Sequence, residues 1–180
     1  MDALTKDEIR KLLSAARKKR QRDWLMILTA WTFGLRVSEL LGIKREHVKD
    51  GFLTVKRLKH SKQTTQPIYD NQEEVFSARS ALIELAAKTP RNQKLFQIGR
   101  KQFWRLIQEH GQTAGIPRHK LHPHALRHSC AMQLIDSAGI HRTQAWLGHK
   151  SMASTGVYLN PSDKEVAEAA CKALGGIVSN

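Results

Sequence analysis

Helical periodicity constrains the fold of this chain more than any other feature of its sequence. Thr5 and Glu8 form a capping box, which predicts a helix that begins near residue 6. An apolar stripe at helical spacing follows: Ile9, Leu12, Leu13 and Ala16. The basic run at residues 17–22 is expected to end or interrupt this helix.

The same pattern recurs along most of the chain. Residues 24–33 predict a second, mostly buried helix that Gly34 can break, which leaves Arg36 at a turn before a short helix from Ser38. Pro123 suits a first helical turn and Gly139 a C-terminal break. Further helices are expected at residues 71–88, 101–113, 123–138, 141–147 and 151–159, with a last one after Pro161.

Strand character is convincing only at residues 52–69. Apolar and β-branched residues flank a polar loop at residues 60–63, which predicts short strands joined by that loop. The expected fold class is therefore mainly α with one small antiparallel β-sheet (α+β).

Composition favours one ordinary domain in a reducing compartment. The chain has 180 residues, of which 41% are hydrophobic, enough for a packed core. No apolar run approaches the roughly 20 residues that span a bilayer, and the first residues do not resemble a signal peptide. Cys130 and Cys171 lie far apart and form neither a CxxC pair nor a disulfide framework. We therefore expect a cytoplasmic protein.

The chain is strongly basic. Its 30 Lys and Arg residues against 16 Asp and Glu residues give a formal net charge of +14. Such a surplus favours a polyanionic partner, of which nucleic acid is the first candidate. A membrane surface is less favoured, because no basic amphipathic helix with an aromatic apolar face stands out. A charge that serves only solubility is the remaining reading.

The sharpest local motif is His124-Ala-Leu-Arg127-His128. On a helix these three side chains share one face, where a guanidinium fork and an imidazole can grip one phosphate. A zinc site is disfavoured, since the Glu that follows the first His in HExxH is missing and Arg127 would place a cation beside the metal. His128 is either a supporting residue of the site or a structural histidine beneath it.

This motif, the later Leu147-Gly-His149 and Tyr158 resemble the C-terminal signature of the tyrosine recombinase (phage integrase) family. Gly34-Leu-Arg36-Val-Ser-Glu39 resembles the first-arginine motif of that family. Lys59 matches the position of its β-hairpin lysine, because the spacing to Pro67 favours Lys59 over the nearby Lys62.

The resemblance runs from about residue 4 to residue 160, with these motifs in the family's order. It is nearest to the small recombinases that invert a promoter segment in fimbrial phase variation. It implies the catalytic-domain fold that tyrosine recombinases share with type IB topoisomerases.

The resemblance also implies a role for each residue. Tyr158 would attack the scissile phosphate to give a 3′-phosphotyrosine and a free 5′-hydroxyl. Arg36 and Arg127 would stabilise the transition state, with hydrogen bonds from His124 and His149, and Lys59 would act as general acid. Glu39 either holds Arg36 in an ion pair or is an ordinary helix carboxylate. No metal, ATP or other cofactor is implied.

The implied organisation is a catalytic domain at residues 1–161 and a helical tail at residues 162–180. The tail either docks on a neighbouring subunit or covers its own core. Since no N-terminal core-binding domain precedes residue 4, the chain is expected to be a minimal recombinase or an excised fragment.

The expected partner is double-stranded DNA with specific crossover sites, in the cytoplasm at the nucleoid rather than at a membrane. A homotetramer would form on paired sites, from a monomer in isolation. Two other functions stay open at this point: a non-catalytic basic DNA-binding module, and strand relaxation like that of a type IB topoisomerase. Candidate DNA contacts are the basic residues Arg17, Lys18, Lys19, Arg20 and Lys62.

Overall fold

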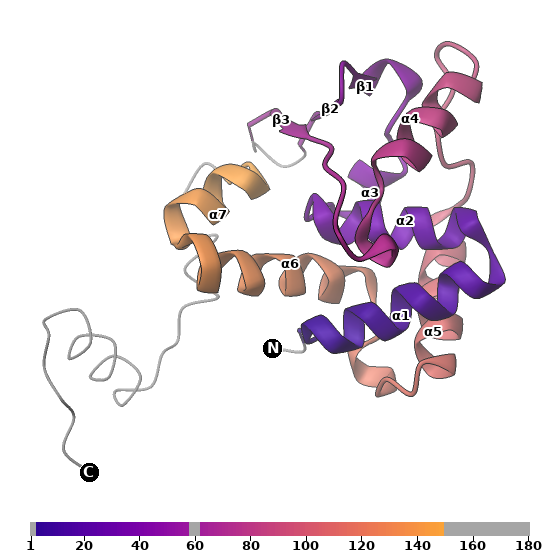
Figure 1. Ribbon diagram of the computed structural model, residues 1–180, viewed down its shortest axis with the longest axis vertical. Helices are drawn as coiled ribbons and strands as arrows, with labels where there is room; N and C mark the ends of the chain where they lie inside the picture. The colour runs from indigo at the N-terminus through magenta and orange to yellow at the C-terminus, as the bar shows by residue number, and fades with distance from the viewer. Residues whose placement is uncertain (1–2, 58–61, 150–180) are drawn as a thin grey trace, which may run out of the picture.

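The computed structural model describes residues 3–57 and 62–149 (Figure 1). Its first helices are α1 (Lys6–Lys19), α2 (Gln21–Thr32) and α3 (Val37–Leu40). A small sheet follows, with strands β1 (Val48–Lys49), β2 (Phe52–Val55) and β3 (Thr64–Pro67). The later helices are α4 (Arg79–Lys88), α5 (Arg100–Thr113), α6 (Pro123–Ala138) and α7 (Ile140–Leu147). The predicted fold class, mainly α with one small antiparallel sheet, is confirmed.

Several sequence-based predictions lie outside the described residues. They concern the candidate residues Lys59 and Tyr158, the helix at 151–159 and the tail at 162–180. Within the described part of the chain, no helix is long and apolar enough to cross a membrane.

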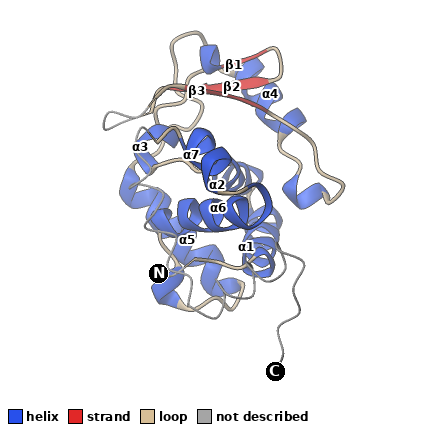
Figure 2. Cartoon of the chain, turned by 90° about the vertical axis from the view of Figure 1, so that its left-hand side faces the viewer, coloured by secondary structure: helices blue, strands red, loops and turns tan. Residues whose placement is uncertain are grey.

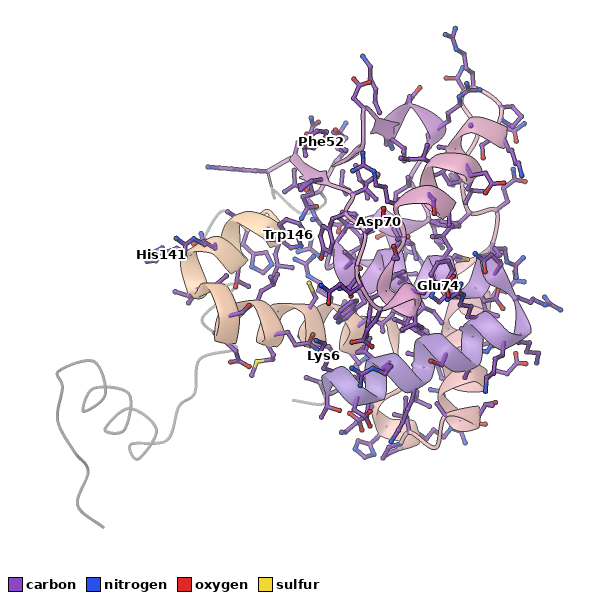
Figure 3. The ribbon with its side chains drawn as sticks, in the orientation of Figure 1. Lys6, Phe52, Asp70, Glu74, His141 and Trp146 are labelled. Atoms are coloured by element: carbon purple, nitrogen blue, oxygen red, sulfur yellow. The ribbon has the colours of Figure 1, made fainter. Side chains whose placement is uncertain are left out.

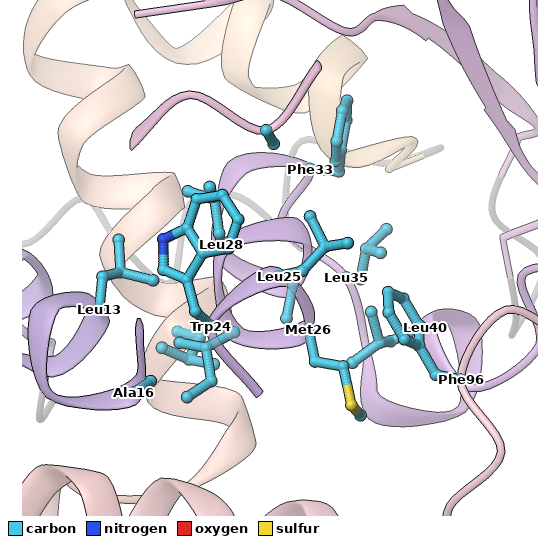
Figure 4. Close-up of a cluster of buried hydrophobic side chains, with 14 of the residues drawn as sticks. Leu13, Ala16, Trp24, Leu25, Met26, Leu28, Phe33, Leu35, Leu40 and Phe96 are labelled. Atoms are coloured by element: carbon cyan, nitrogen blue, oxygen red, sulfur yellow. The ribbon is translucent and has the colours of Figure 1, made fainter. Parts of the chain in front are cut away.

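The core forms where α1, α2, α5 and α6 pack together. The predicted stripe of α1 is fully buried, and α2 is buried from Asp23 to Ala30. Figure 4 shows Leu13 and Ala16 of α1 on one side of α2, and Leu35, Leu40 and Phe96 on its other side, near Leu25 and Met26. The sheet lies at one end of the helical body (Figure 2). This arrangement leaves the ends of several helices close to the sheet.

Helix ends follow the local signals in the sequence. Thr5 and Glu8 form both hydrogen bonds of the predicted capping box. Arg20 is extended, with φ −153°, and separates α1 from α2. Helix α6 begins at Pro123 and is ended by Gly139, whose φ is +79°, as predicted.

The predicted helix at residues 71–88 is wrong over its first half. Asn71 Oδ1 accepts a hydrogen bond from the Glu73 N–H at 2.9 Å, and Ser77 Oγ lies 2.5 Å from Asp70 Oδ1. Such local side-chain hydrogen bonds offer the backbone an alternative to the helix. A short 3₁₀ turn, Glu74–Phe76, forms instead, and α4 begins only at Arg79.

Within the described residues the sheet has the order β1-β2-β3, and both pairings are antiparallel. Strand β1 precedes the predicted β segment and was not expected from the sequence. The β2–β3 register pairs Phe52 with Pro67 and Val55 with Thr64. Thr64 and Gln66 of β3 point to the buried face, although both are polar.

Candidate active site

Two tight turns bring distant parts of the chain together below the sheet. Gly34 ends α2 with φ +55°, and a Cβ there would overlap Leu147 Cδ2 of α7. Gly148 follows α7 with φ +69°, and a Cβ there would lie 2.8 Å from the Lys62 carbonyl oxygen. Both positions therefore need glycine, because they combine left-handed backbone with close packing. The turns place Arg36 and His149 on either side of one cluster.

Trp146 fixes α7 against α2. Its Nε1 donates to the Thr32 carbonyl at 3.0 Å, and its ring stacks on Phe33 with centroids 6.3 Å apart. Figure 3 shows Trp146 on the side of α7 that faces the body of the protein, whereas His141 points away. The turn that carries His149 is thus held by the preceding aromatic residue.

Glu39 is the carboxylate at the centre of the cluster. Its Oε1 lies 2.7 Å from Arg36 Nη1, and its Oε2 accepts from the Arg36 backbone N–H at 2.9 Å. Oε2 also lies 3.3 Å from Arg57 Nη1 and 3.8 Å from Arg127 Nη1. The Glu39 side chain is fully buried, while Arg36 is partly exposed. Glu39 therefore orients Arg36 through both its backbone and its guanidinium group.

Arg127 projects from α6 into the same cluster. Its Nη1 donates to the Gly34 carbonyl, and its Nη2 lies 2.6 Å from His149 Nε2 and 3.4 Å from the Leu147 carbonyl oxygen. The residue is 4% exposed. Arg127 thus joins the turn before Arg36 to the turn that presents His149.

The electrostatics of the cluster keep His149 neutral. Burial, together with the cations Arg127, Arg36 and Arg57, lowers the pKa of His149 to about 4. Burial raises the pKa of the neighbouring Cys130 thiol to about 12. Among the described residues, three guanidinium groups of the cluster form ion pairs with one carboxylate, that of Glu39. This excess of positive charge suits an anionic ligand such as a phosphodiester.

His124 and His128 lie on one face of α6, as the spacing predicted. Their ring centroids are 6.3 Å apart, with His124 exposed in the first turn and His128 half-buried behind it. Burial, followed by the nearby His124, lowers the pKa of His128. His122 caps the helix by accepting from the Ala125 N–H at 3.1 Å. No group of three potential metal ligands occurs within residues 3–57 and 62–149.

Arg57 belongs to this cluster, although the sequence assigned it no role in the site. It follows β2, and its side chain is completely buried beside Glu39. Its local sequence, Arg57-Leu-Lys, resembles that of the fimbrial recombinases but does not predict its contacts, because its partners include the distant residues Phe33, Gly34 and Trp146.

The candidate DNA contacts have different surroundings. Lys62 has an exposed side chain, and its backbone N–H donates to the Gly148 carbonyl at 3.0 Å, next to His149. Arg17 lies 2.6 Å from Glu74 and over the ring of Trp24, and Lys19 pairs with Glu109. Lys18 and Arg20 are exposed. The end of α1 that carries these four residues lies on the opposite side of the molecule from α7 in Figure 1. Their role in DNA binding stays a prediction.

Comparisons with known proteins identify the family of the chain. The model of the phage integrase family matches residues 2–165. The chain belongs to this family. Tyrosine recombinase XerA of Pyrococcus furiosus is 33% identical over 174 residues, which cover 93% of this chain and 60% of that protein. The type 1 fimbriae regulatory protein FimE of Escherichia coli K12 is 31% identical over 143 residues, which cover 74% of this chain and 72% of FimE.

Solved structures show the same fold. A crystal structure of XerA recombinase has a TM-score of 0.73 and 25% identity, over 95% of this chain and 62% of that one. The XerH recombinase bound to its difH substrate has a TM-score of 0.75 and 22% identity, over 94% of this chain and 54% of XerH. The chain thus spans about three fifths of the XerA relatives that it matches. The fold is that of the tyrosine recombinase catalytic domain.

Proposed function

We propose that this chain carries the catalytic domain of a site-specific DNA recombinase, which breaks and rejoins strands through a 3′-phosphotyrosine. One observation carries the proposal: Arg36, Arg127 and the neutral His149 converge around Glu39 in a protein of the phage integrase family. Two guanidinium forks and an imidazole can contact the non-bridging oxygens of one phosphate. They are fixed in place before the substrate arrives, which is how an enzyme stabilises charge that develops in the transition state.

The resemblance to the family supports the remaining roles that we propose. Tyr158 Oη attacks phosphorus and loses its proton, while the bond from phosphorus to the 5′-oxygen breaks. Lys59 donates a proton to that leaving oxygen as general acid. His124, exposed at the start of α6, adds a hydrogen bond to the phosphate. Rejoining is the reverse reaction with a 5′-hydroxyl as nucleophile. Because the phosphotyrosine bond conserves the free energy of the broken strand, no ATP is required.

The proposed partner is double-stranded DNA with a crossover site. The net charge of +14 supports binding to a polyanion. XerH has been crystallised on its difH substrate, and a lambda integrase dimer on a core site. By analogy, we propose that this protein binds a DNA crossover site. We further propose that monomers assemble into a homotetramer on paired sites, in the cytoplasm at the nucleoid. Residues 162–180 are the proposed docking segment between subunits.

A trapping experiment tests the activity. The protein is incubated with duplexes made from the DNA that flanks its own coding sequence, each with a nick near the cleavage point. After cleavage, the short strand between the cleavage point and the nick diffuses away, so the covalent intermediate accumulates. A protein–DNA adduct on a denaturing gel is the expected result. Tyr158→Phe is expected to abolish the adduct while leaving DNA binding intact. An adduct that survives Tyr158→Phe would contradict the proposal, and so would no adduct with any flanking sequence. Relaxation of supercoiled DNA by a monomer, without paired sites, would point to a topoisomerase instead.

A further inference from the structure

Arg57 is a charged side chain in a place where charge is costly. Its side chain has no exposed surface, and burial lowers the pKa of its guanidinium group. Burying an ion costs several kcal/mol unless hydrogen bonds and an opposite charge compensate. The guanidinium group of Arg57 therefore needs partners within the protein.

Every N–H of Arg57 is engaged by the protein. Nε donates to Thr64 Oγ1 at 3.0 Å, and Nη1 contacts the Gly34 carbonyl oxygen at 3.4 Å and Glu39 Oε2 at 3.3 Å. Nη2 lies 3.0 Å from each of three acceptors: the Phe33 carbonyl, Gln66 Oε1 and the Trp146 carbonyl. These six acceptors face the five N–H groups of one guanidinium. Arg57 thus acts on other protein groups.

The acceptors of Arg57 belong to the segments that carry the phosphate-binding residues. The Phe33 and Gly34 carbonyls form the turn before Arg36, and the Gly34 carbonyl also accepts from Arg127. Glu39 holds Arg36. The Trp146 carbonyl lies just before the turn that presents His149. One planar group therefore spans the Arg36 turn, the Glu39 carboxylate and the His149 turn.

Gln66 completes this connection from β3. Its Nε2 donates to the same Trp146 carbonyl at 3.0 Å, and its Oε1 accepts from Arg57. The β2–β3 hairpin is thus tied to α7 by two polar side chains in a buried layer. Burying polar groups in this way is costly unless each of them is paired, and a fully paired network holds a single geometry.

We propose that Arg57 is a positioning residue, which sets the relative placement of Arg36, Arg127 and His149 for the phosphate. The inference rests on the proposed function, because it assigns these three residues to one bound phosphate. Gln66 and Thr64 support the same placement by fixing the guanidinium plane of Arg57.

Arg57→Lys is the decisive variant. Lysine keeps the positive charge beside Glu39, but its single ammonium cannot reach all of these acceptors. We expect this variant to stay folded, to bind duplex DNA with the wild-type Kd, and to form the covalent adduct on the order of 10- to 100-fold more slowly, as for other groups that orient reacting residues. Thr64→Val, which removes the acceptor of Nε and a donor to Gln66 Oε1 but leaves the other acceptors of Arg57, is expected to slow the reaction less. Arg79→Lys is the matched control, because Arg79 also donates a hydrogen bond to a backbone carbonyl, that of Ile68. The Arg79→Lys protein is expected to form the adduct at the wild-type rate.

A substrate with sulfur in place of the leaving 5′-oxygen separates two ways in which Arg57 could act. A thiol has a pKa of about 8.5, so its thiolate leaves without a proton from a general acid. If Arg57 positions the phosphate-binding residues, the Arg57→Lys defect persists with this substrate. Full recovery of the wild-type rate would overturn the inference, because Arg57 would then act through protonation of the leaving group. A wild-type rate for Arg57→Lys on ordinary DNA would overturn it as well.

A measurement without DNA keeps the inference distinct from the proposed function. The imidazole Cε1–H signal of His149 is followed by NMR as pH is varied, in the wild type and in Arg57→Lys. A changed chemical shift and pKa of His149 in the folded variant support the positioning role, even if the wild type forms no adduct. Identical His149 titrations in both proteins would contradict it.

Discussion

At the scale of single residues, Glu39 is a buried carboxylate that pairs with three guanidinium groups. Its carboxylate lies among Arg36, Arg57 and Arg127, where it is shielded from water. Glu39→Gln removes the negative charge and leaves buried guanidinium groups without their counter-ion. We expect the free energy of unfolding to fall by about 3 kcal/mol, which urea denaturation can measure. Glu46→Gln is the control, because Glu46 is exposed and 3.9 Å from Lys44, and its loss should change stability by less than about 0.5 kcal/mol.

His149 gives the molecule a pH dependence of known sign. Its pKa falls from 6.5 to about 4 on folding, so the unfolded chain binds the proton more readily between these values. Stability contributed by neutral His149 is therefore present above pH 6.5 and is lost as the pH falls towards 4. Between pH 7 and pH 5 we expect a loss on the order of 2 kcal/mol.

Urea denaturation of the wild type and of His149→Gln at both pH values measures this contribution. The wild type should lose more stability than the variant, since glutamine does not titrate. Equal losses in the two proteins would show that other groups, such as His128, account for the pH dependence.

At the scale of elements, the two glycine turns that follow α6 and α7 form a natural pair for comparison. Gly139 and Gly148 both have positive φ, +79° and +69°. A Cβ on Gly139 would meet nothing within 4 Å, whereas one on Gly148 would lie 2.9 Å from Arg57 Cγ as well as close to Lys62. Gly139→Ala therefore adds backbone strain alone, about 2–3 kcal/mol, because φ +79° with ψ 167° is a conformation that only glycine adopts readily.

Gly148→Ala adds a smaller backbone strain, that of a left-handed helical residue with φ +69° and ψ 24°, together with a collision against the β2–β3 hairpin. We expect it to cost about 2–4 kcal/mol of stability and to slow adduct formation, because the turn that carries His149 must shift. Thermal unfolding of both variants gives the comparison. Adduct formation is compared as well: if Gly139→Ala slowed it as much as Gly148→Ala, packing against the hairpin would not be the cause.

The elements also show which features a sequence can predict. The capping box at Thr5 and the bounds of α6 were predicted correctly because both depend on residues within a few positions of each other. The prediction of a helix from residue 71 was wrong because it relied on helical periodicity. Periodicity does not reveal the local hydrogen bonds that Asn71 and Ser77 make. Arg57 was missed because its contacts span up to 89 residues of sequence. When the partners of a buried charge lie so far away in the sequence, the residues next to that charge show no pattern that predicts its burial.

At the scale of the whole molecule, the site is assembled from parts of the chain that are distant in sequence. Residues 33–39 supply one wall, the β2–β3 hairpin a second, and α6 with the turn after α7 the rest. Motifs predicted which residues would meet, through resemblance to a family, but the physical reason for their meeting is the packing of α2, α6 and α7 below the sheet. Hence changes in that packing, as well as in the candidate catalytic residues, are expected to alter activity.

The overall charge of the molecule leads to a prediction about salt. The net charge of +14 favours contacts with DNA phosphates, and each neutralised phosphate releases counter-ions. With four or more such contacts, a plot of log K against log salt concentration has a slope of about −4 or steeper. Fluorescence anisotropy with a labelled duplex of arbitrary sequence, at a series of salt concentrations, measures the slope.

The double variant Lys18→Gln/Arg20→Gln tests whether the exposed end of α1 contacts DNA. A less negative slope than that of the wild type would show that those residues bind DNA phosphates, and an unchanged slope would show that the contacts lie elsewhere. A flat dependence for the wild type would contradict the view that its basic surface binds DNA.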